Sequence, residues 1–124
     1  MAEKHLSGHL RELVMKQVPG DSVYRRIEDA SGNMGTPDVW LIAAGVEMWV
    51  ELKWTRTPGE TPVMRHGQRG FAKAVRRAGG RAWRLAGNDR NSDVRLWLGN
   101  DPAKAQPLYE GPLDLTCWEL MAYG

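Results

Sequence analysis

Two acidic residues and a lysine stand close together in a strand-rich stretch of the sequence. Asp38 follows a proline, and Glu51 and Lys53 come after a run rich in Val, Trp, Leu and Ile. Strand side chains alternate between faces, so Glu51 and Lys53, two residues apart, point the same way. Twelve residues separate Asp38 from Glu51, a length that suits one hairpin. The spacing therefore predicts that all three side chains meet at one edge of a sheet.

This combination of side chains favours a divalent cation. Two carboxylates held close together repel each other, and one of them is normally protonated. Mg²⁺ removes that conflict, because it prefers oxygen ligands, takes few protein carboxylates and keeps waters and substrate phosphate. Such an ion can polarise a phosphodiester and lower the pKa of bound water, while a neighbouring lysine orients that water. A plain surface ion pair between Glu51 and Lys53 is the alternative without chemistry.

The elements that must position these residues follow from hydrophobic spacing. Residues 38–43 and 47–54 are the two strands of the hairpin, which turns at Ala44-Gly45. On the second strand, the face opposite Glu51 carries the side chains that we expect in the core: Met48, Val50, Leu52 and Trp54.

Helices and further strands are expected around the hairpin. Apolar residues at helical spacing predict a helix over residues 3–17 and another over 65–78, closed by Gly79-Gly80. Strands are predicted at 23–27, 81–85 and 94–98, loops at 30–35, 55–62 and 86–93, and a short helix near Pro112. The order helix, three strands, helix, two strands predicts an α/β fold, in which helices flank a mixed sheet.

Composition limits what kind of protein this is. The 124 residues suit a single domain spanning 1–124. Cys117 is the one cysteine, which excludes an intrachain disulfide and a multi-cysteine zinc site. The sequence has no signal-peptide pattern and no membrane-length apolar run. We therefore expect a cytoplasmic location, in the host cytoplasm if the chain is viral.

The segments GTPD at 35–38 and ELK at 51–53 resemble the PD-(D/E)XK nuclease signature. Together with Gln68 at the start of the following helix, they are similar to the small phage and bacterial VRR-NUC nucleases, which in turn resemble Holliday-junction resolvases. The resemblance runs from about Glu3 to Leu85. It implies a restriction-endonuclease-like fold and hydrolysis of DNA with Mg²⁺ or Mn²⁺.

The resemblance also implies roles for individual residues. Asp38 and Glu51 would bind the metal with the backbone carbonyl of Leu52, and Lys53 would position the nucleophilic water. Gln68 shares a helix face with apolar residues, so its amide needs a partner. Both a position near the metal or a phosphate and a simple helix-start hydrogen bond remain open for Gln68.

Members of this family often add a glutamate from the first helix, and the sequence offers two. Glu3 lies near the middle of the apolar stripe of Leu6, Leu10 and Val14, whereas Glu12 falls on the opposite side. We therefore expect Glu3 as the third carboxylate and a solvated Glu12. A frayed N-terminal Glu3 without any role is the open alternative.

Basic residues flank the predicted site, in a run that is densest between residues 65 and 84. Phosphate contacts dominate the affinity of proteins for nucleic acids. An ordinary solvated helix face is the alternative for such a run. The side chains that we expect to contact DNA are Arg25, Arg26, Arg65, Arg69 and Lys73.

Aromatic residues and histidines add little to this interpretation. Most of the six tryptophans are expected to fill core positions, with stacking on unpaired bases as the alternative for one of them. His5 and His9 are one helical turn apart, on a face away from the apolar stripe, and are expected to be surface residues.

The sequence thus predicts a metal-dependent endonuclease that is selective for branched DNA or junctions. Cutting both strands of such a substrate needs two sites, which favours a symmetric homodimer. Two alternatives remain: a DNA-binding module that kept the nuclease fold without catalysis, and a structural phage protein with a coincidental motif.

Overall fold

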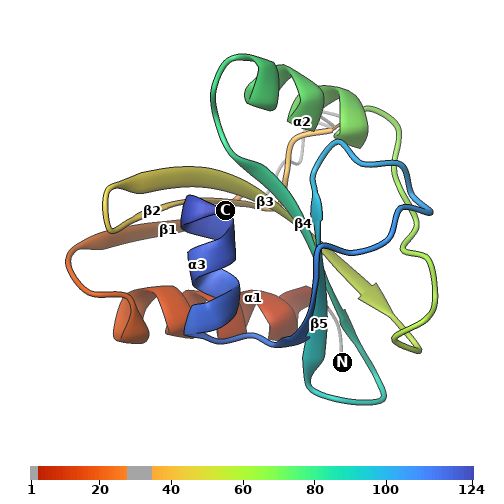
Figure 1. The fold of residues 1–124 in the computed structure, drawn as a ribbon, viewed down its shortest axis with the longest axis horizontal. Coiled ribbons are helices and arrows are strands. Elements are labelled where there is room, and N and C mark those ends of the chain that lie inside the picture. Colours follow the sequence, from red (N-terminus) through yellow and green to blue (C-terminus); the bar gives the residue numbers. More distant parts are fainter. Residues whose placement is uncertain (1–2, 28–34) are drawn as a thin grey trace.

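A six-stranded sheet lies at the centre of the structure, a computed structural model that describes residues 3–27 and 35–124 (Figure 1). The strands follow one another across the sheet in chain order: β1 (Ser22–Arg26), β2 (Val39–Ala43), β3 (Val46–Thr55), β4 (Ala82–Asn88), β5 (Asp93–Leu98) and β6 (Tyr109–Pro112). Neighbouring strands are antiparallel except β3 and β4, which run parallel. Parallel neighbours need a crossover connection, and helix α2 (Gln68–Arg77) supplies it.

Helices cover both faces of this sheet. Helix α1 (Glu3–Glu12) continues into a π-helical turn, η1 (Leu13–Gln17), and lies with α3 (Leu115–Tyr123) on one face, whereas α2 lies on the other (Figure 1). The helix predicted over residues 3–17 is therefore confirmed, with a wider last turn. The predicted α/β fold, a mixed sheet flanked by helices, is the observed one.

The buried face of α1 follows the apolar spacing of its sequence. Leu6, Leu10 and Val14 are at most 3% exposed, and they join one core cluster with Met48 and Leu52 of β3. Burying a side chain of this size stabilises the fold by about 1.5–3 kcal/mol. Because this core covers one face of β3, the alternate side chains of the strand must point to the other face, where α2 lies.

The β2–β3 hairpin turns at the predicted residues. Ala44 and Gly45 have φ angles of 51° and 76°, and positive φ at both central positions gives a tight turn whose twist matches the strands. Val39 pairs with Val50. Asp38, one residue before β2, therefore lies beside Glu51, as the sequence predicts.

Helix α2 begins three residues later than the predicted start at residue 65. Its N-cap residue Gly67 has a φ of 87°, a left-handed conformation that glycine adopts at little cost. Gly35 packs so closely here that a Cβ would collide with the carbonyl oxygen of Gly67. The absence of a side chain at Gly35, three residues before Asp38, thus allows the start of α2 to pack closely against the segment that leads into the hairpin. The loop predicted at 30–35 lies outside the described residues except for Gly35.

The β4–β5 hairpin is longer than predicted. Strand β4 extends to Asn88 and β5 starts at Asp93, so half of the loop predicted at 86–93 is strand. Asn88 explains the short turn, because its side-chain oxygen accepts hydrogen bonds from the backbone N–H groups of Arg90 and Asn91.

The C-terminal segment contains a strand that the sequence does not predict. Strand β6 includes a glycine and a proline, which disfavour strands, but an edge strand tolerates proline. Helix α3 begins at Leu115 and not near Pro112, because the Asp114 side chain caps it by accepting from Thr116 N and Cys117 N. Among the described residues, no helix has the length and apolar character needed to cross a membrane.

Candidate active site

Asp38 and Glu51 come together where β2 begins. Asp38 Oδ2 accepts a hydrogen bond from the backbone N–H of Leu52 at 2.9 Å. This bond ties Asp38 to β3 beyond the last residue pair of the hairpin, Val39 with Val50. The carboxylate of Asp38 is therefore held in place by the strand that carries Glu51.

Gln68, the first residue of α2, connects the two ionisable side chains of β3. Its Nε2 donates to Glu51 Oε2 at 2.7 Å, and its Oε1 accepts from Lys53 Nζ at 2.8 Å. Gln68 Oε1 also accepts from the backbone N–H of Arg65 at 2.8 Å. A carboxylate acceptor and an ammonium donor on opposite sides determine the orientation of the amide. Gln68 therefore makes the helix-start hydrogen bond considered from the sequence and also contacts two of the predicted site residues, while its position near a metal or a phosphate stays a prediction.

These ionisable side chains are deeply buried. Glu51 is 8% exposed and Lys53 is 5% exposed, and Lys53 Nζ lies 3.7 Å from Glu51 Oε2. Burial raises the pKa of Glu51 to about 8, and the nearby Asp38 carboxylate adds to the rise. Burial also lowers the pKa of Lys53. Without a bound ion or substrate, burial thus disfavours both the ionised carboxylate of Glu51 and the protonated amine of Lys53.

One carboxylate oxygen of Glu51 is available for a ligand. Glu51 Oε1 is buried without a hydrogen-bond partner among the described residues, although buried polar atoms are nearly always paired. A cation beside Asp38 would satisfy this oxygen and favour the ionised Glu51. Residues 3–27 and 35–124 contain no group of three His, Cys, Asp or Glu side chains suited to a metal. Mg²⁺ is commonly bound through one or two carboxylates, so the donors fit Mg²⁺ better than zinc.

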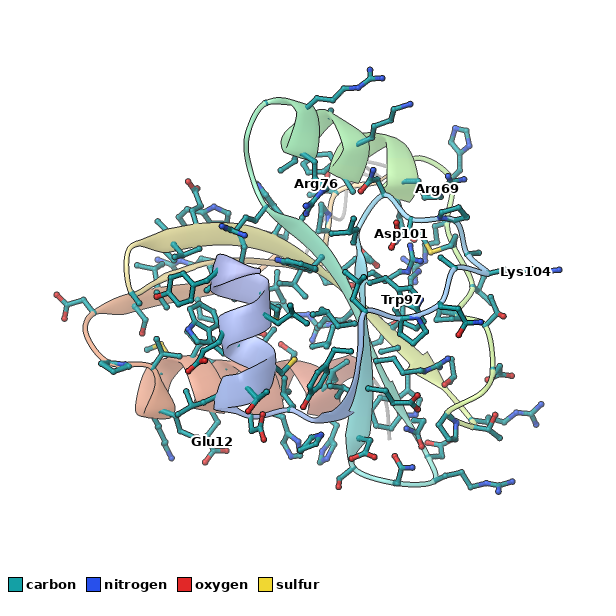
Figure 2. All side chains as sticks on the ribbon, viewed as in Figure 1. Glu12, Arg69, Arg76, Trp97, Asp101 and Lys104 are labelled. Carbon is teal, nitrogen blue, oxygen red and sulfur yellow. The ribbon has the colours of Figure 1, made fainter. Side chains whose placement is uncertain are left out.

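The two glutamates of α1 have different surroundings. Burial raises the pKa of Glu3, and the Asp38 carboxylate raises it further, while Lys53 opposes the rise. Glu3 also lines a cavity of about 260 Å³ together with Lys53. Glu12 lies far along the helix and points away from the sheet (Figure 2), where it forms an exposed ion pair with Lys16 at 3.3 Å. The structure therefore places Glu3, and not Glu12, beside the candidate site.

The predicted DNA contacts are exposed but do not share one face. Arg26 and Arg65 are near enough to Glu3 to oppose the rise of its pKa. Arg25 points to the opposite face of β1 from Arg26, because strand side chains alternate. All five of these basic side chains are exposed: Arg25, Arg26, Arg65, Arg69 and Lys73.

Arg84 belongs to the basic run of the sequence but not to the exposed surface. Its side chain is 0% exposed, because every residue of β4 is buried between neighbouring strands and packed layers. Its Nη1 and Nη2 atoms donate to the backbone carbonyls of Asp101 at 3.0 Å and Pro102 at 3.1 Å. Arg84 is therefore not available for the phosphate contacts that the basic run of the sequence suggests.

Arg84, Trp97 and Arg95 form a cluster that the sequence analysis missed, called here the arginine–tryptophan cluster. Both guanidinium carbons lie 5.1 Å from the centre of the Trp97 ring. Arg95 donates to the backbone carbonyl of Glu60 at 2.9 Å, and Trp97 Nε1 donates to that of Ala105 at 2.7 Å. The cluster thus holds the loops that follow β3 and β5 (Figure 2). The spacing of Arg95 and Trp97, two apart on a strand, is the one sign of it in the sequence.

The fold has a known counterpart. The chain is similar in structure to Archaeoglobus fulgidus Hjc, a Holliday junction resolvase from an archaeal hyperthermophile, with a TM-score of 0.52 and 15% sequence identity. The similarity covers 77% of this chain and 72% of that one. No protein-family model matches the chain, and no curated protein matches it in sequence. At this identity the likeness concerns the fold, and it confirms the predicted restriction-endonuclease-like architecture.

Proposed function

We propose that this chain is a metal-dependent endonuclease of the PD-(D/E)XK kind that hydrolyses DNA phosphodiester bonds with Mg²⁺ or Mn²⁺. The observation that carries the proposal is the buried cluster of Asp38, Glu51, Lys53 and Gln68, in which Glu51 Oε1 has no partner among the described residues. This oxygen belongs to a carboxylate whose pKa is raised by burial and by the nearby Asp38 carboxylate, and a cation at this position would favour the ionised form of both groups. The fold shared with a Holliday junction resolvase supports the same conclusion.

In this proposal each residue has a distinct role. Asp38 and Glu51 would hold the ion together with the backbone carbonyl of Leu52. The Glu3 carboxylate would join them as a further ligand only by moving closer, because the described residues contain no group of three such side chains within metal-binding reach. The ion, when bound, polarises the phosphodiester and lowers the pKa of a water molecule. Gln68 is a positioning residue, because its amide fixes Glu51 Oε2 and Lys53 Nζ relative to each other.

Lys53 supplies the positive charge nearest to the reacting phosphate. Its ammonium has three N–H donors, of which one is directed to Gln68 Oε1. The remaining donors can orient the attacking water and stabilise charge that develops in the transition state. Because burial lowers the pKa of Lys53, a nearby phosphate would also help to keep it protonated.

We further propose that the substrate is branched DNA and that the single domain of residues 1–124 acts as a symmetric homodimer. Arg26, Arg65, Arg69 and Lys73 would contact phosphates around the site, with Arg25 reaching the DNA from the other face of β1. A non-catalytic DNA-binding module with the same fold is the second candidate. The retained Asp38, Glu51 and Lys53 cluster argues against it.

A cleavage gel with four substrates tests the proposal: a four-way junction, a flap, a plain duplex and a single strand. Mg²⁺ should support cutting of the branched substrates, and EDTA should stop it. Asp38→Asn and Glu51→Gln should lose detectable cleavage while still binding DNA, and Glu12→Gln is the control on an exposed carboxylate.

Two results would contradict the proposal in different ways. Wild-type cleavage by Asp38→Asn or Glu51→Gln would show that the site is elsewhere. Tight DNA binding by the wild-type protein, without cleavage in either Mg²⁺ or Mn²⁺, would favour the non-catalytic module.

A further inference from the structure

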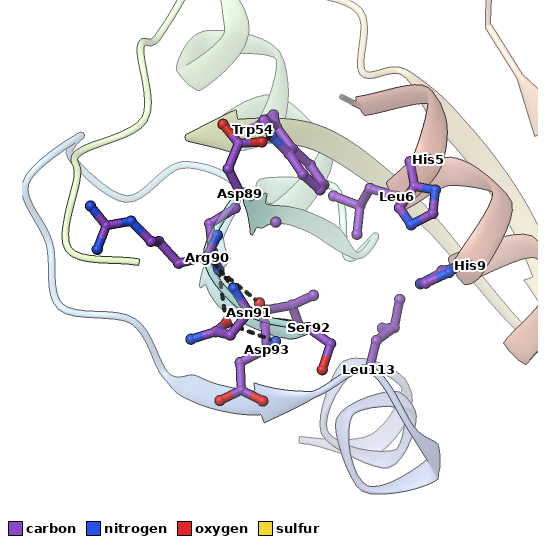
Figure 3. A pocket seen from close by; sticks show the side chains of 13 residues that line it. His5, Leu6, His9, Trp54, Asp89, Arg90, Asn91, Ser92, Asp93 and Leu113 are labelled. Carbon is purple, nitrogen blue, oxygen red and sulfur yellow. Dashed lines mark hydrogen bonds between the residues drawn. The ribbon is translucent and has the colours of Figure 1, made fainter. Parts of the chain in front are cut away.

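A second cavity, of about 280 Å³, shares Trp54 with the cavity that Glu3 and Lys53 line. Figure 3 shows its walls: His5 and His9 from α1, Trp54 near the end of β3, and the turn between β4 and β5. Trp54 follows Lys53 directly, but the two side chains point to opposite faces of β3. The shared Trp54 therefore places the two cavities next to each other around the end of this strand, where a short single-stranded segment of DNA can reach both.

Trp54 is held in one orientation. Its indole Nε1 donates to Asp89 Oδ1 at 2.7 Å. Its ring lies directly against Gly87 of β4, where an added Cβ would sit 2.5 Å from Trp54 Cζ3 and 2.8 Å from Cε3. The sequence analysis expected Trp54 in the core, but the side chain is only half-buried. A fixed, partly exposed ring of this kind needs no reordering before it binds a flat ligand.

Two further aromatic rings approach Trp54. The His5 ring meets it edge-on, with centroids 6.4 Å apart, and the His5 and His9 rings are 4.4 Å apart. Both histidines are exposed, as the sequence predicts, and they also line this cavity. Stacking of a base on an aromatic side chain contributes about 1–3 kcal/mol.

Two acidic residues of the β4–β5 turn, Asp89 and Asp93, form another part of the cavity wall. Asp89 Oδ1 accepts from Trp54 Nε1. Asp93 alternates along β5 with the core residue Val94, and its carboxylate points away from the cavity (Figure 3). Recognition in this cavity therefore depends on the rings, which stack on any base.

We propose that this cavity binds an unpaired nucleobase next to the scissile phosphate by stacking on its aromatic rings, without a preference among the bases. The inference rests on the proposed nuclease function and extends it. It gives a reason for selectivity towards flaps and other branched DNA with unpaired bases, because a fully paired duplex offers no free base. A transition metal on His5 and His9 is the rival occupant, but the described residues provide no third ligand of the His, Cys, Asp or Glu type.

A binding experiment in EDTA tests this site separately from catalysis. Fluorescence anisotropy would compare flap DNA in which each unpaired position in turn carries dC, dA, dT or an abasic residue. At one position, an abasic residue should weaken binding by about 5- to 150-fold, which corresponds to ~1–3 kcal/mol of stacking. At that position dC, dA and dT should all bind more tightly than the abasic residue, because stacking tolerates every base.

Variants on the cavity wall sharpen the test. The double variant His5→Ala, His9→Ala should reduce the loss caused by the abasic residue. Glu12→Ala, an exposed change on the same helix, should not alter this loss, and neither should Asp93→Asn, because the Asp93 carboxylate points away from the cavity. Because no cleavage is required, a failure of the proposed nuclease activity in Mg²⁺ would be seen in a different assay.

Three outcomes would overturn the inference. The first is binding that is insensitive to abasic residues at every unpaired position. The second is an abasic loss that is the same in the wild type and in the double variant of His5 and His9. The third is binding of Zn²⁺ alone that depends on His5 and His9, with no dependence of DNA affinity on the unpaired base.

Discussion

Two regions of this protein bury charged side chains, and the buried charged groups have different hydrogen-bond partners in the two regions. In the arginine–tryptophan cluster, the Nη atoms of Arg84 and Arg95 donate to backbone carbonyls of two loops. In the candidate active site, Glu51 and Lys53 share the amide of Gln68, and Glu51 Oε1 has no partner among the described residues. Arg84 Nε is unpaired as well, but the rest of its guanidinium is committed to holding a loop.

The comparison suggests a criterion for separating structural from functional buried charge. Each cluster contains groups whose pKa is shifted towards the neutral form by burial. Burial by itself therefore does not identify a site. The distinguishing feature is an acceptor, Glu51 Oε1, that lies beside a second carboxylate and lacks a donor. We expect changes in the first cluster to affect stability and changes in the second to affect chemistry.

The largest effect is expected for Trp97→Ala, which removes the ring between two buried guanidinium groups. Loss of a buried Trp costs about 3–5 kcal/mol, and this change also frees the carbonyl of Ala105. Urea denaturation should show the loss. Trp40→Ala, at a half-buried position on β2, is the control and should cost less. Reduced cleavage by Trp97→Ala with unchanged stability would place the cluster within the reaction site.

The next effect is expected for Lys53→Ala. Removing a donor that acts in the transition state costs about 10²- to 10³-fold in rate. Single-turnover cleavage at saturating Mg²⁺ should fall by this factor, with a smaller change in metal affinity. Lys16→Ala, an exposed lysine on η1, should leave the rate unchanged. An unaltered rate in Lys53→Ala would remove this residue from the mechanism.

A third prediction concerns the pH dependence of stability without divalent ions. The pKa of Glu51 is raised from 4.5 to about 8, so the folded state holds this proton more tightly than the unfolded state. The resulting stabilisation is complete below pH 4.5 and is lost as pH rises through 8. Wild-type protein should therefore lose up to about 5 kcal/mol across this window, at about 1.4 kcal/mol for each unit by which the pKa is raised.

Glu51→Gln should lack that pH-dependent loss and should become more stable than the wild type above pH 8. Thermal melts from pH 4 to pH 9 in EDTA would measure the difference, with Glu12→Gln as the control. Parallel curves for wild type and Glu51→Gln would show that the Glu51 pKa is not raised in the folded protein.

The smallest effect separates the two glutamates of α1. Glu3→Gln should lower Mg²⁺-dependent cleavage about tenfold, a typical loss for a residue that supports a metal site, with little change in melting temperature. Glu12→Gln should be neutral for both. Loss of activity in Glu12→Gln alone would show that α1 presents its other face to the site. Activity in both variants would leave Asp38 and Glu51 as the only acidic ligands.

The local part of the candidate site could be predicted from the sequence, because its geometry is set within one hairpin. The alternation of β3 decides that Glu51 and Lys53 share a face, and the twelve-residue spacing with the Ala44-Gly45 turn decides that Asp38 joins them. The apolar stripe of α1 likewise separates Glu3 from Glu12. These relations depend on helix and strand periods, which short segments carry by themselves.

Contacts between distant segments were decided only by the tertiary structure. Gln68 reaches Glu51 and Lys53 because the crossover places α2 on that face of the sheet and Gly35 packs against Gly67. The sequence puts Arg84 in a basic run, but the central position of β4 buries it. Likewise, the cavity at Trp54 forms only where α1, β3 and the β4–β5 turn converge. Such contacts depend on how whole elements stack, and the spacing of residues within one element contains no information about the element that will cover it.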